Sequence, residues 1–457
     1  MIDASQIPED VLSVCRRLGE NGYEAYLVGG CVRDMLVGRP IGDFDVASSA
    51  RPEQILKVFG ARFSVPTGLQ HGTVTVLTGQ PPRYRHVEVT TFRGEGAYLD
   101  GRHPSVVTFG ATLAEDLSRR DFTMNAIAYD PQTRTIVDLH QGQQDIARRL
   151  VRTVGDPVQR FSEDGLRPMR AVRQSTQLGF DVDGSTLAAI PATMASFRKV
   201  SAERVRDELF KMLMAPQPSK GVELMRQTGL LAEVLPELLP TVGCVQNRYH
   251  KHDVYQHILA TLDAARPDPI LRLAALLHDV GKPATQIPRE DAPGEFGFFK
   301  HEYVGAEMVQ TIASRLRLSR VETDMLVGLV AHHMFFYTPD WTDGTVRRFV
   351  TRVGADRLPL LFSLREADIA SHGQGQDPEG ETRELRTRIS HVATEDAALR
   401  VKDLAVNGAD VMRVLGIGPG PLVGQVLGHL LERVLDDASL NQKEILERLI
   451  PEVARPS

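Results

Sequence analysis

Two aspartates behind a pair of glycines are the first residues in this sequence whose types and spacing could carry out chemistry. The segment GGCVRD (29–34) follows a strand-like run and opens a helix, and Asp43-Phe44-Asp45 comes shortly after it. Residues i and i+2 of a strand point to the same side, so we expect Asp43 and Asp45 to present two carboxylates on one face. Two carboxylates held that close need a cation, and hard oxygen ligands suit Mg²⁺.

The residues around this pair suit phosphoryl transfer. Gly29 and Gly30 allow the backbone to approach a phosphate closely, and the helix start together with Arg33 supplies positive charge. In phosphoryl transfer, catalysis is mostly positioning and neutralisation of charge by metal ions. Glu88, in the run HVEVTTFR, is a candidate third carboxylate on a neighbouring strand. An Asp-x-Asp by itself is usually a solvated strand end, and its coupling to the glycine pair is what favours the functional interpretation.

A second group combines arginines with carboxylates in RRDFTMNA (119–126) and DPVQRFSEDGLRPMRAVR (156–173). We expect one helix to carry Asp164, Arg167, Arg170 and Arg173, with the first two as neighbours and Arg173 facing nearly away from Asp164. A carboxylate accepts an exocyclic amine, and a guanidinium donates to a ring nitrogen. Cytosine and adenine offer that edge, whereas uracil presents a carbonyl. Such a pair could select C and A without a template, although an ordinary helical ion pair is the alternative.

A third group has the residue types of a transition-metal site. LAALLHDVGKP (273–283) places His278 and Asp279 at the end of an apolar helix. The candidates for the remaining ligands are His257, His301, His333 and Asp368. Neutral imidazole combined with carboxylate suits Mn, Ni or Zn, and such sites also support phosphoester hydrolysis with two metal ions. One His-Asp dipeptide means little, so the prediction depends on the whole set.

The elements that must position these residues divide the chain in two. Residues before about 140 contain strand-like runs dense in Val, Thr and aromatics, namely YEAYLVGG, GDFDVAS, HGTVTVLTG and RHVEVTTF. From about 145 onward, apolar residues recur at helical spacing. We therefore expect an α+β fold with a mixed sheet in the head and helices elsewhere. The expected parts are a head (1–145), a helical neck (146–230), a metal-binding helical domain (231–380) and a helical C-terminal region (381–457).

Composition excludes several classes of protein. With 53 basic and 59 acidic residues, a net charge of −6 excludes a globally basic nucleic-acid binder, so a polyanion site must be local. Residues 119–211 hold 15 Lys or Arg against 12 Asp or Glu, which makes the neck the expected place for it. Cys15, Cys31 and Cys244 are too few for a disulfide framework, and a reducing cytoplasm fits best. We expect no secretory signal and no membrane span.

Several of these motifs occur in a recognisable order: GGCVRD, GDFD, HGTVTV, VEVTTFR, EDLSRRDFTMNA, RFSEDGLRPMRAVR and VSAERVRDEL. In this order they resemble bacterial class II tRNA nucleotidyltransferases, the CCA-adding enzymes, over about the first 215 residues. The resemblance implies a polymerase-beta-type head and transfer of CMP and AMP from CTP and ATP onto a tRNA 3′ end, with release of pyrophosphate. It implies that Asp43 and Asp45 bind Mg²⁺ and activate the primer 3′-hydroxyl. The residue pattern adds Glu88 as the candidate third catalytic carboxylate.

The resemblance also implies roles in nucleotide binding. Asp164 and Arg167 would read the base, and Asn125 would contact the sugar. The other residues that it places at the nucleotide are Gly29, Gly30, Arg33, Arg120, Asp121, Arg170 and Arg173. The protein would act as a monomer or homodimer.

Related families leave some alternatives open. Bacterial poly(A) polymerases share the GG, DxD and RRDF motifs, but they carry a basic GRRF-like segment where this chain has ARFSVPTGLQHGTVTV. The stretch FRGEGAYLDGRHP has full length, which argues against an enzyme that adds only CC and leaves an enzyme that adds only A open.

The HDVGK wording resembles HD-type phosphohydrolases. In some CCA-adding enzymes such a domain resembles a 2′,3′-cyclic phosphodiesterase or phosphatase that acts on damaged RNA ends. One rival interpretation therefore makes this domain the main activity, with the head recognising RNA. Another is an RNA-binding protein without catalysis.

Overall fold

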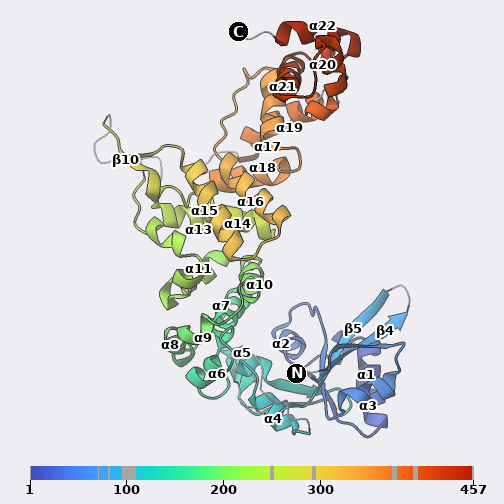
Figure 1. Ribbon diagram of the computed structural model, residues 1–457. Coiled ribbons are helices and arrows are strands. Elements are labelled where there is room, and N and C mark those ends of the chain that lie inside the picture. The colour runs from blue at the N-terminus through green and yellow to red at the C-terminus, as the bar shows by residue number, and fades with distance from the viewer. Residues whose placement is uncertain are drawn as a thin grey trace. The chain divides into compact units, whose positions relative to one another are not determined.

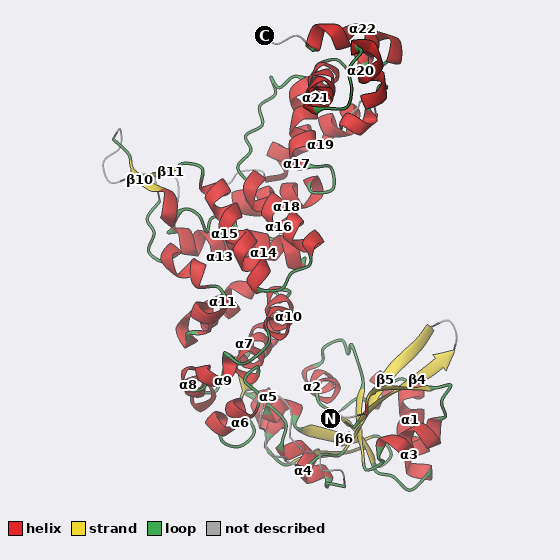
Figure 2. Cartoon of the chain, viewed as in Figure 1, coloured by secondary structure: helices red, strands yellow, loops and turns green. Residues whose placement is uncertain are grey.

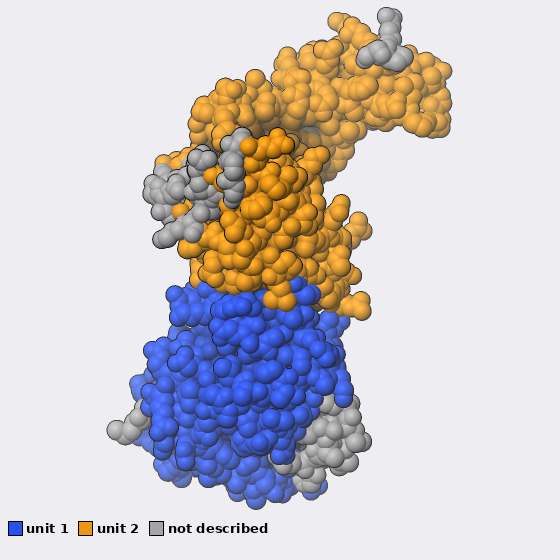
Figure 3. Space-filling view, turned by 90° about the vertical axis from the view of Figure 1, so that its left-hand side faces the viewer, with its two compact units in different colours: residues 1–236 blue, residues 237–457 orange. Residues whose placement is uncertain are grey.

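The computed structural model describes residues 2–69, 72–80, 83–94, 110–246, 252–290, 295–372, 378–394 and 400–454. The chain divides into two compact units, residues 1–236 and residues 237–457 (Figure 3). Most of the stretch FRGEGAYLDGRHP lies outside the described residues. No helix among the described residues is both long enough and apolar enough to cross a lipid bilayer.

A seven-stranded mixed sheet forms the first part of unit 1, as the α+β prediction requires. Its strands are β1 (Ala25–Val28), β2 (Asp45–Ser48), β3 (Ser64–Gly68), β4 (Thr73–Gln80), β5 (Arg83–Thr91), β6 (Ile127–Asp130) and β7 (Thr135–Asp138). They lie in the order β3-β4-β5-β2-β1-β6-β7. Every neighbouring pair is antiparallel except β2 and β5, which run parallel.

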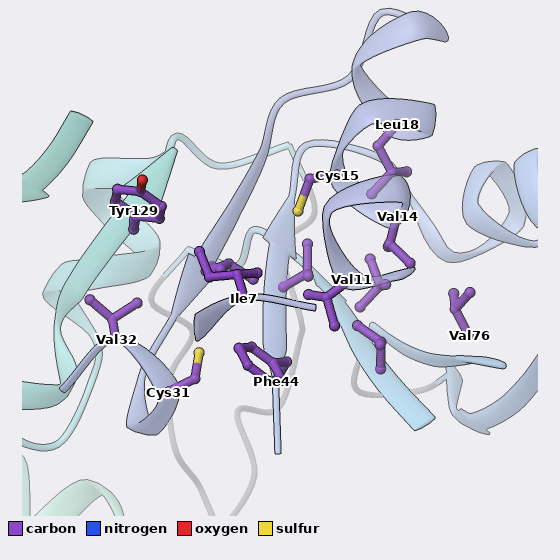
Figure 4. Packing of buried hydrophobic residues seen from close by; sticks show 14 of the residues in the cluster. Ile7, Val11, Val14, Cys15, Leu18, Cys31, Val32, Phe44, Val76 and Tyr129 are labelled. Atoms are coloured by element: carbon purple, nitrogen blue, oxygen red, sulfur yellow. The ribbon is translucent and has the colours of Figure 1, made fainter. Parts of the chain in front are cut away.

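The main core of this part lies on one face of the sheet, where α1 (Glu9–Glu20) and α3 (Pro52–Phe59) contribute apolar residues. Val11, Val14 and Leu18 recur at helical spacing along α1, and Figure 4 shows them on the same side as Phe44. Adjacent strand residues point to opposite faces, so a smaller cluster with Phe92 and α4 (Leu113–Ser118) packs on the other face. Asp45 shares that second face, because β2 places Ala47 there.

The remaining elements of unit 1 are mostly helical (Figures 1 and 2). They include α2 (Gly30–Val37), α5 (Gly142–Ala147), α6 (Pro157–Glu163), α7 (Arg167–Leu178), α8 (Gly184–Ala192), α9 (Met194–Phe197), α10 (Ala202–Leu213), α11 (Pro218–Thr228) and α12 (Leu230–Val234), with 3-10 helices at Ala4–Gln6 and Thr123–Asn125. A short parallel pair of strands, β8 (Leu150–Val151) and β9 (Asp181–Val182), adds to the expected helices. Helix α7 packs against both α10 and α11.

The regular elements described in unit 2 are helices, apart from the antiparallel pair β10 (Gln286–Pro288) and β11 (Phe296–Phe298). Its helices are α13 (Val254–Ala264), α14 (Pro269–Leu277), α15 (His301–Arg315), α16 (Arg320–His332), α17 (Asp343–Val353), α18 (Leu358–Ser371), α19 (Pro378–Thr394), α20 (Gly408–Leu415), α21 (Pro421–Asp436) and α22 (Lys443–Val453), with 3-10 helices at Pro236–Thr241, Pro283–Thr285, Val401–Asp403 and Ala438–Leu440. Helices α20, α21 and α22 enclose a hydrophobic cluster of their own.

Candidate functional sites

The glycine pair forms the turn that the sequence predicts between a strand and a helix. Gly29 follows β1, has a φ of 76° and caps the start of α2. A positive φ favours glycine, and the space beside this residue is also restricted. A Cβ atom on Gly29 would lie 3.2 Å from Nη1 of Arg120 and 3.8 Å from Oδ2 of Asp45. The turn therefore brings bare backbone next to a guanidinium group and a carboxylate.

Two of the three predicted catalytic carboxylates lie side by side on neighbouring strands. Asp45 is the first residue of β2, and the parallel pairing of β2 with β5 places it opposite Glu88. Asp43 is exposed and precedes the strand, so the prediction that both aspartates belong to one strand is wrong for Asp43. The pairing of β2 with β1 and its pairing with β5 both begin at Asp45, opposite Val28 and Glu88, so Asp43 precedes both ladders.

Burial and like charge shift the proton affinity of this pair. Burial raises the pKa of Asp45 to about 6, and the negative charges of Glu88 and Asp43 add to the effect, while Arg120 opposes it. A bound cation would remove the repulsion that raises this pKa. The donor set therefore fits a hard divalent ion such as Mg²⁺.

These residues face a polar cleft of about 360 Å³ within unit 1. The charged residues that line it are Asp45, Glu88, Arg93, Arg119, Arg120, Asp121, Asp164, Arg167 and Arg170. The structure thus brings carboxylates predicted for metal binding together with arginines predicted for nucleotide binding. Arg93 and Arg119 were missed as site residues, although both lie inside the motifs VEVTTFR and EDLSRRDFTMNA.

The predicted pair for base reading has a different geometry from the one expected. Helix α6 ends at Glu163 and α7 begins at Arg167, so Asp164 lies between two helices and the single helical row is wrong. Asp164 pairs with Arg204 of α10, which donates from Nη1 to Oδ1 at 3.2 Å and from Nη2 to Oδ2 at 2.9 Å. Arg167 donates instead to Oε2 of Glu163 at 2.6 Å.

The segment between the two helices is closely packed and is followed by Pro168 in the first turn of α7, where a continuous helix would be broken. Gly165 follows Asp164, and a Cβ atom on it would lie 2.2 Å from the carbonyl oxygen of Ser196. The close approach of the Ser196 backbone thus requires glycine where the predicted helix would have continued. Asp164 and Arg167 nevertheless both line the cleft.

Arg170 and Arg173 of α7 pair with different carboxylates, and only Arg170 lines the cleft. Arg170 donates from Nε and Nη2 to Oδ2 of Asp121, at 2.9 and 2.6 Å. Burial alone would raise the pKa of Asp121, but the Arg170 guanidinium holds it well below its usual range. Arg173 donates from Nε to Oε2 of Glu208 at 2.5 Å and does not line the cleft.

The other predicted nucleotide ligands form a network beside the cleft. Arg33 donates from Nη1 to Oδ1 of Asn125 at 2.9 Å and to Oε1 of Gln174 at 3.3 Å. Asn125 in turn donates from Nδ2 to Oδ1 of Asp121 at 3.2 Å. Gly30, Arg33 and Asn125 lie outside the lining of the cleft, and Arg33 and Asn125 are connected to it through Asp121.

In unit 2 the structure brings all six predicted metal ligands together in a buried cluster. His257 lies in α13, His278 and Asp279 follow α14, His301 begins α15, His333 follows α16 and Asp368 lies in α18. Nε2 of His257 is 3.1 Å from Oδ1 of Asp368 and 3.2 Å from Nε2 of His278. These contacts join helices far apart in the sequence around one polar centre.

Each of the four histidines has its other ring nitrogen engaged. Nδ1 of His278, His301 and His333 lies 2.7 to 2.8 Å from the carbonyl oxygens of Ala275, Phe298 and Val330, respectively. Nδ1 of His257 is 3.0 Å from Oγ of Ser371. An Nδ1–H that donates to a carbonyl leaves Nε2 as an acceptor, which is the usual arrangement of a histidine that binds a metal.

Asp279 is the centre of this arrangement. Its Oδ1 is 3.2 Å from Nε2 of His301 and 3.7 Å from Nε2 of His333. Its Oδ2 is 3.4 Å from Nε2 of His257 and 3.3 Å from Nε2 of His278. Each carboxylate oxygen of Asp279 thus faces two histidines. In both groups of three residues, the two histidines and Asp279, the ligand atoms are close enough together to hold one ion.

The chemistry of this donor set fits a divalent transition metal, since it combines neutral imidazole with carboxylate in a buried centre. His372 is a further candidate ligand that the sequence reasoning missed, grouped with His257 and Asp368. It lies one helical turn after Asp368, so the i, i+4 spacing is the signal that could have identified it.

Comparison with known families identifies both parts of the chain. Residues 25–152 match the family described as "Poly A polymerase head domain", and residues 254–373 match "HD domain". A model of a polymerase A region matches residues 179–241, and a model of a tRNA nucleotidyltransferase domain matches residues 376–450. The fold and the cleft thus define a nucleotidyltransferase with a poly(A)-polymerase-type head and an HD domain.

Full-length relatives narrow the assignment. The chain is 35% identical over 447 residues to the CCA-adding enzyme of Geobacillus kaustophilus, covering 95% of each chain. It is 32% identical over 456 residues to the CCA-adding enzyme of Streptococcus gordonii, covering 97% of each. A crystal structure of the Bacillus stearothermophilus CCA-adding enzyme in complex with CTP matches with a TM-score of 0.73 and 31% identity, covering 97% of this chain and 96% of that one. The chain belongs to the family of CCA-adding enzymes.

Proposed function

We propose that this protein adds CMP and AMP, taken from CTP and ATP, to the 3′ end of tRNA and releases pyrophosphate. The observation that carries the proposal is the cleft of unit 1, where Asp45 and Glu88 face Arg93, Arg119 and Arg120. Carboxylates for a metal ion opposite arginines for a triphosphate are the groups that phosphoryl transfer requires. Membership in the CCA-adding family, of which one relative has been solved with CTP, supports the choice of substrates.

The residues that would hold Mg²⁺ are Asp45, Glu88 and Asp43. When bound, the ion would neutralise charge on the triphosphate and increase the acidity of the primer 3′-hydroxyl. The cationic side chains Arg93, Arg119 and Arg120 would bind phosphate oxygens on the other side of the cleft.

We assign the choice of base to Asp164 and Arg167, which both line the cleft. Asp164 accepts two hydrogen bonds from Arg204, and a carboxylate can only accept. It would accept from the amino group of cytosine or adenine and repel the carbonyl of uracil. Arg173, which pairs with Glu208, would support α7 and not contact the nucleotide.

The proposal is tested with tRNAs that lack zero, one, two or three terminal nucleotides, incubated with labelled CTP or ATP. We expect CMP on the two shorter acceptors and AMP only on the tRNA that ends in CC. In the variant Asp45→Ala we expect no transfer, while tRNA binding persists, because the carboxylate places a metal ion. Transfer of AMP alone would assign an A-adding enzyme, and untemplated runs of A would assign a poly(A) polymerase.

A second proposed function belongs to unit 2. We propose that the cluster around Asp279 binds a divalent transition metal and hydrolyses phosphoesters at RNA ends. The convergence of four histidines and two aspartates in a buried centre supports this proposal. Cyclic-phosphate hydrolysis with added Mn²⁺ or Ni²⁺ should be lost in Asp279→Ala and kept in Asp45→Ala. Equal loss in both variants would contradict two separate activities.

We also propose that the chain has the four parts 1–145, 146–230, 231–380 and 381–457. The separate cluster of α20–α22 supports the last of these. The three cysteines are buried and free, which is consistent with a reducing compartment such as the cytoplasm.

A further inference from the structure

Asp116 is a buried carboxylate next to the cleft, and the proposed reaction gives it no role of its own. It lies in α4, is only 1% exposed and does not line the cleft. Its Oδ1 accepts from Nε of Arg119 at 3.1 Å and from Nη2 of Arg119 at 2.7 Å. Its Oδ2 accepts from Nη2 of Arg120 at 3.1 Å. One carboxylate thus holds two successive arginines, both of which line the cleft.

Local structure explains how neighbouring arginines reach the same carboxylate. Thr112 and Glu115 form a capping box that fixes the start of α4. The helix ends at Ser118, so Arg119 and Arg120 stand three and four residues after Asp116, at the spacing at which helical side chains meet.

The position of Arg120 shows which alternative ion pair its contact with Asp116 prevents. Its Nη1 lies beside the Gly29 turn, where a Cβ atom would lie 3.2 Å from Nη1 and 3.8 Å from Oδ2 of Asp45, yet among the described residues Arg120 pairs with Asp116 and forms no ion pair with Asp45. Its Nε is buried and has no hydrogen-bond partner in the described part of the chain. Nη1 of Arg120 is 3.5 Å from the carbonyl oxygen of Asn125, a long contact that leaves this nitrogen able to donate to a ligand in the cleft, while Asp116 holds Nη2.

We propose that Asp116 is a positioning residue for the incoming nucleotide. It holds Arg119 and Arg120 as a pair of triphosphate ligands and prevents Arg120 from collapsing onto Asp45 and Glu88 before the nucleotide arrives. The inference rests on the proposed nucleotidyl transfer in this cleft, and it adds a residue that acts through Arg120 without touching the substrate.

The test is Asp116→Asn, which keeps the size of the side chain and removes its charge. We expect KM for CTP and the Kd of CTP to rise about tenfold, the order of one charge-assisted hydrogen bond, while kcat changes much less. In the Arg120→Gln background the same substitution should raise KM by a clearly smaller factor, because the residue through which it acts is already changed.

Asp145 provides a matched control in the same unit. It is also 1% exposed, and its Oδ2 accepts from Nε of Arg152 at 2.9 Å and from the Thr123 hydroxyl at 2.5 Å. Neither Asp145 nor Arg152 lines the cleft. Asp145→Asn should therefore lower Tm without raising KM for CTP.

The outcomes separate this inference from the proposed function. A wild-type protein that transfers no nucleotide would refute the function, whereas the Kd of CTP tests Asp116 independently of turnover. An Asp116→Asn variant that folds and keeps its KM and Kd would overturn the inference, as would an equal KM rise in Asp145→Asn. If Asp116→Asn does not fold, Asp116→Glu replaces it, because the longer side chain displaces both guanidinium groups. KM and Kd for CTP are then measured for Asp116→Glu in the wild-type and Arg120→Gln backgrounds, and the expected and contradicting results stay the same.

Discussion

Acidification should weaken Mg²⁺ binding in the nucleotide cleft, because an ion binds Asp45 only when this carboxyl is ionised. Burial and the charge of Glu88 raise the pKa of Asp45 to about 6. For one group with this pKa, the ionised fraction is about 0.9 at pH 7 and about 0.1 at pH 5. The apparent affinity for Mg²⁺ should thus fall about tenfold over this range, which corresponds to ~1.4 kcal/mol.

The raised pKa of Asp45 also determines whether the free energy of unfolding rises or falls with pH. The folded, ion-free protein keeps a proton on Asp45 between about pH 4 and about pH 6, whereas the unfolded chain has released it. This group therefore reduces the free energy of unfolding as the pH rises through that window. Binding of Mg²⁺ should reverse the loss, since a cation stabilises the ionised form.

Isothermal titration of MgCl₂ into the protein between about pH 5 and pH 8 measures the effect. The background should be Asp279→Ala, which removes the metal site of unit 2 from the signal. In Glu88→Gln, overall affinity should be lower and the midpoint should move to lower pH, because a like charge next to Asp45 is gone. An affinity that does not change with pH, or a midpoint that Glu88→Gln leaves in place, would refute this electrostatic reasoning.

Three further substitutions test individual contacts. Gly29→Ala should lower the free energy of unfolding by ~1 to 2 kcal/mol and raise KM for CTP, because φ is positive and the new Cβ would lie 3.2 Å from Nη1 of Arg120. The control is Gly42→Ala, where the new Cβ would lie in open space, and an equal effect there would contradict the argument. Arg204→Gln should reduce the preference for CTP over UTP about tenfold in competition kinetics, with tRNA affinity unchanged; retained preference would exclude a role in base reading. Asp279→Asn should lower the metal retained after dialysis, measured by elemental analysis, while nucleotide addition continues.

The residue pattern predicted four of the seven strands of the sheet and missed β3, β6 and β7, because only four runs carry a clear local signal. The runs around Leu27, Val46, Val76 and Val89 all form strands, since each is dense in β-branched and apolar residues within one element. The six predicted ligands of the unit 2 cluster do come together, because buried histidines and aspartates in one helical domain have few other roles, although His372 was missed.

Contacts between residues far apart in the sequence could not be predicted from the residue pattern. Pro168 is a local signal that the helix is interrupted after Asp164, whereas the packing of the Ser196 backbone against Gly165 depends on residues far away in the sequence. The true partner of Asp164, Arg204, comes from α10, and the choice between Arg167 and Arg204 depends on how α10 packs on α7. Asp43 was assigned to the strand because the end of a strand depends on where its neighbour ends.

The parallel pairing of β2 and β5 has a consequence for the folding of the enzyme. The antiparallel hairpin of β4 and β5 can form early, because its strands are adjacent in sequence. The contact between Asp45 and Glu88 requires β2 to close onto β5 across the whole segment between them, so it carries a larger loop-closure entropy. Recovery of Mg²⁺ and CTP binding during refolding would therefore report on that closure, after the hairpin has formed.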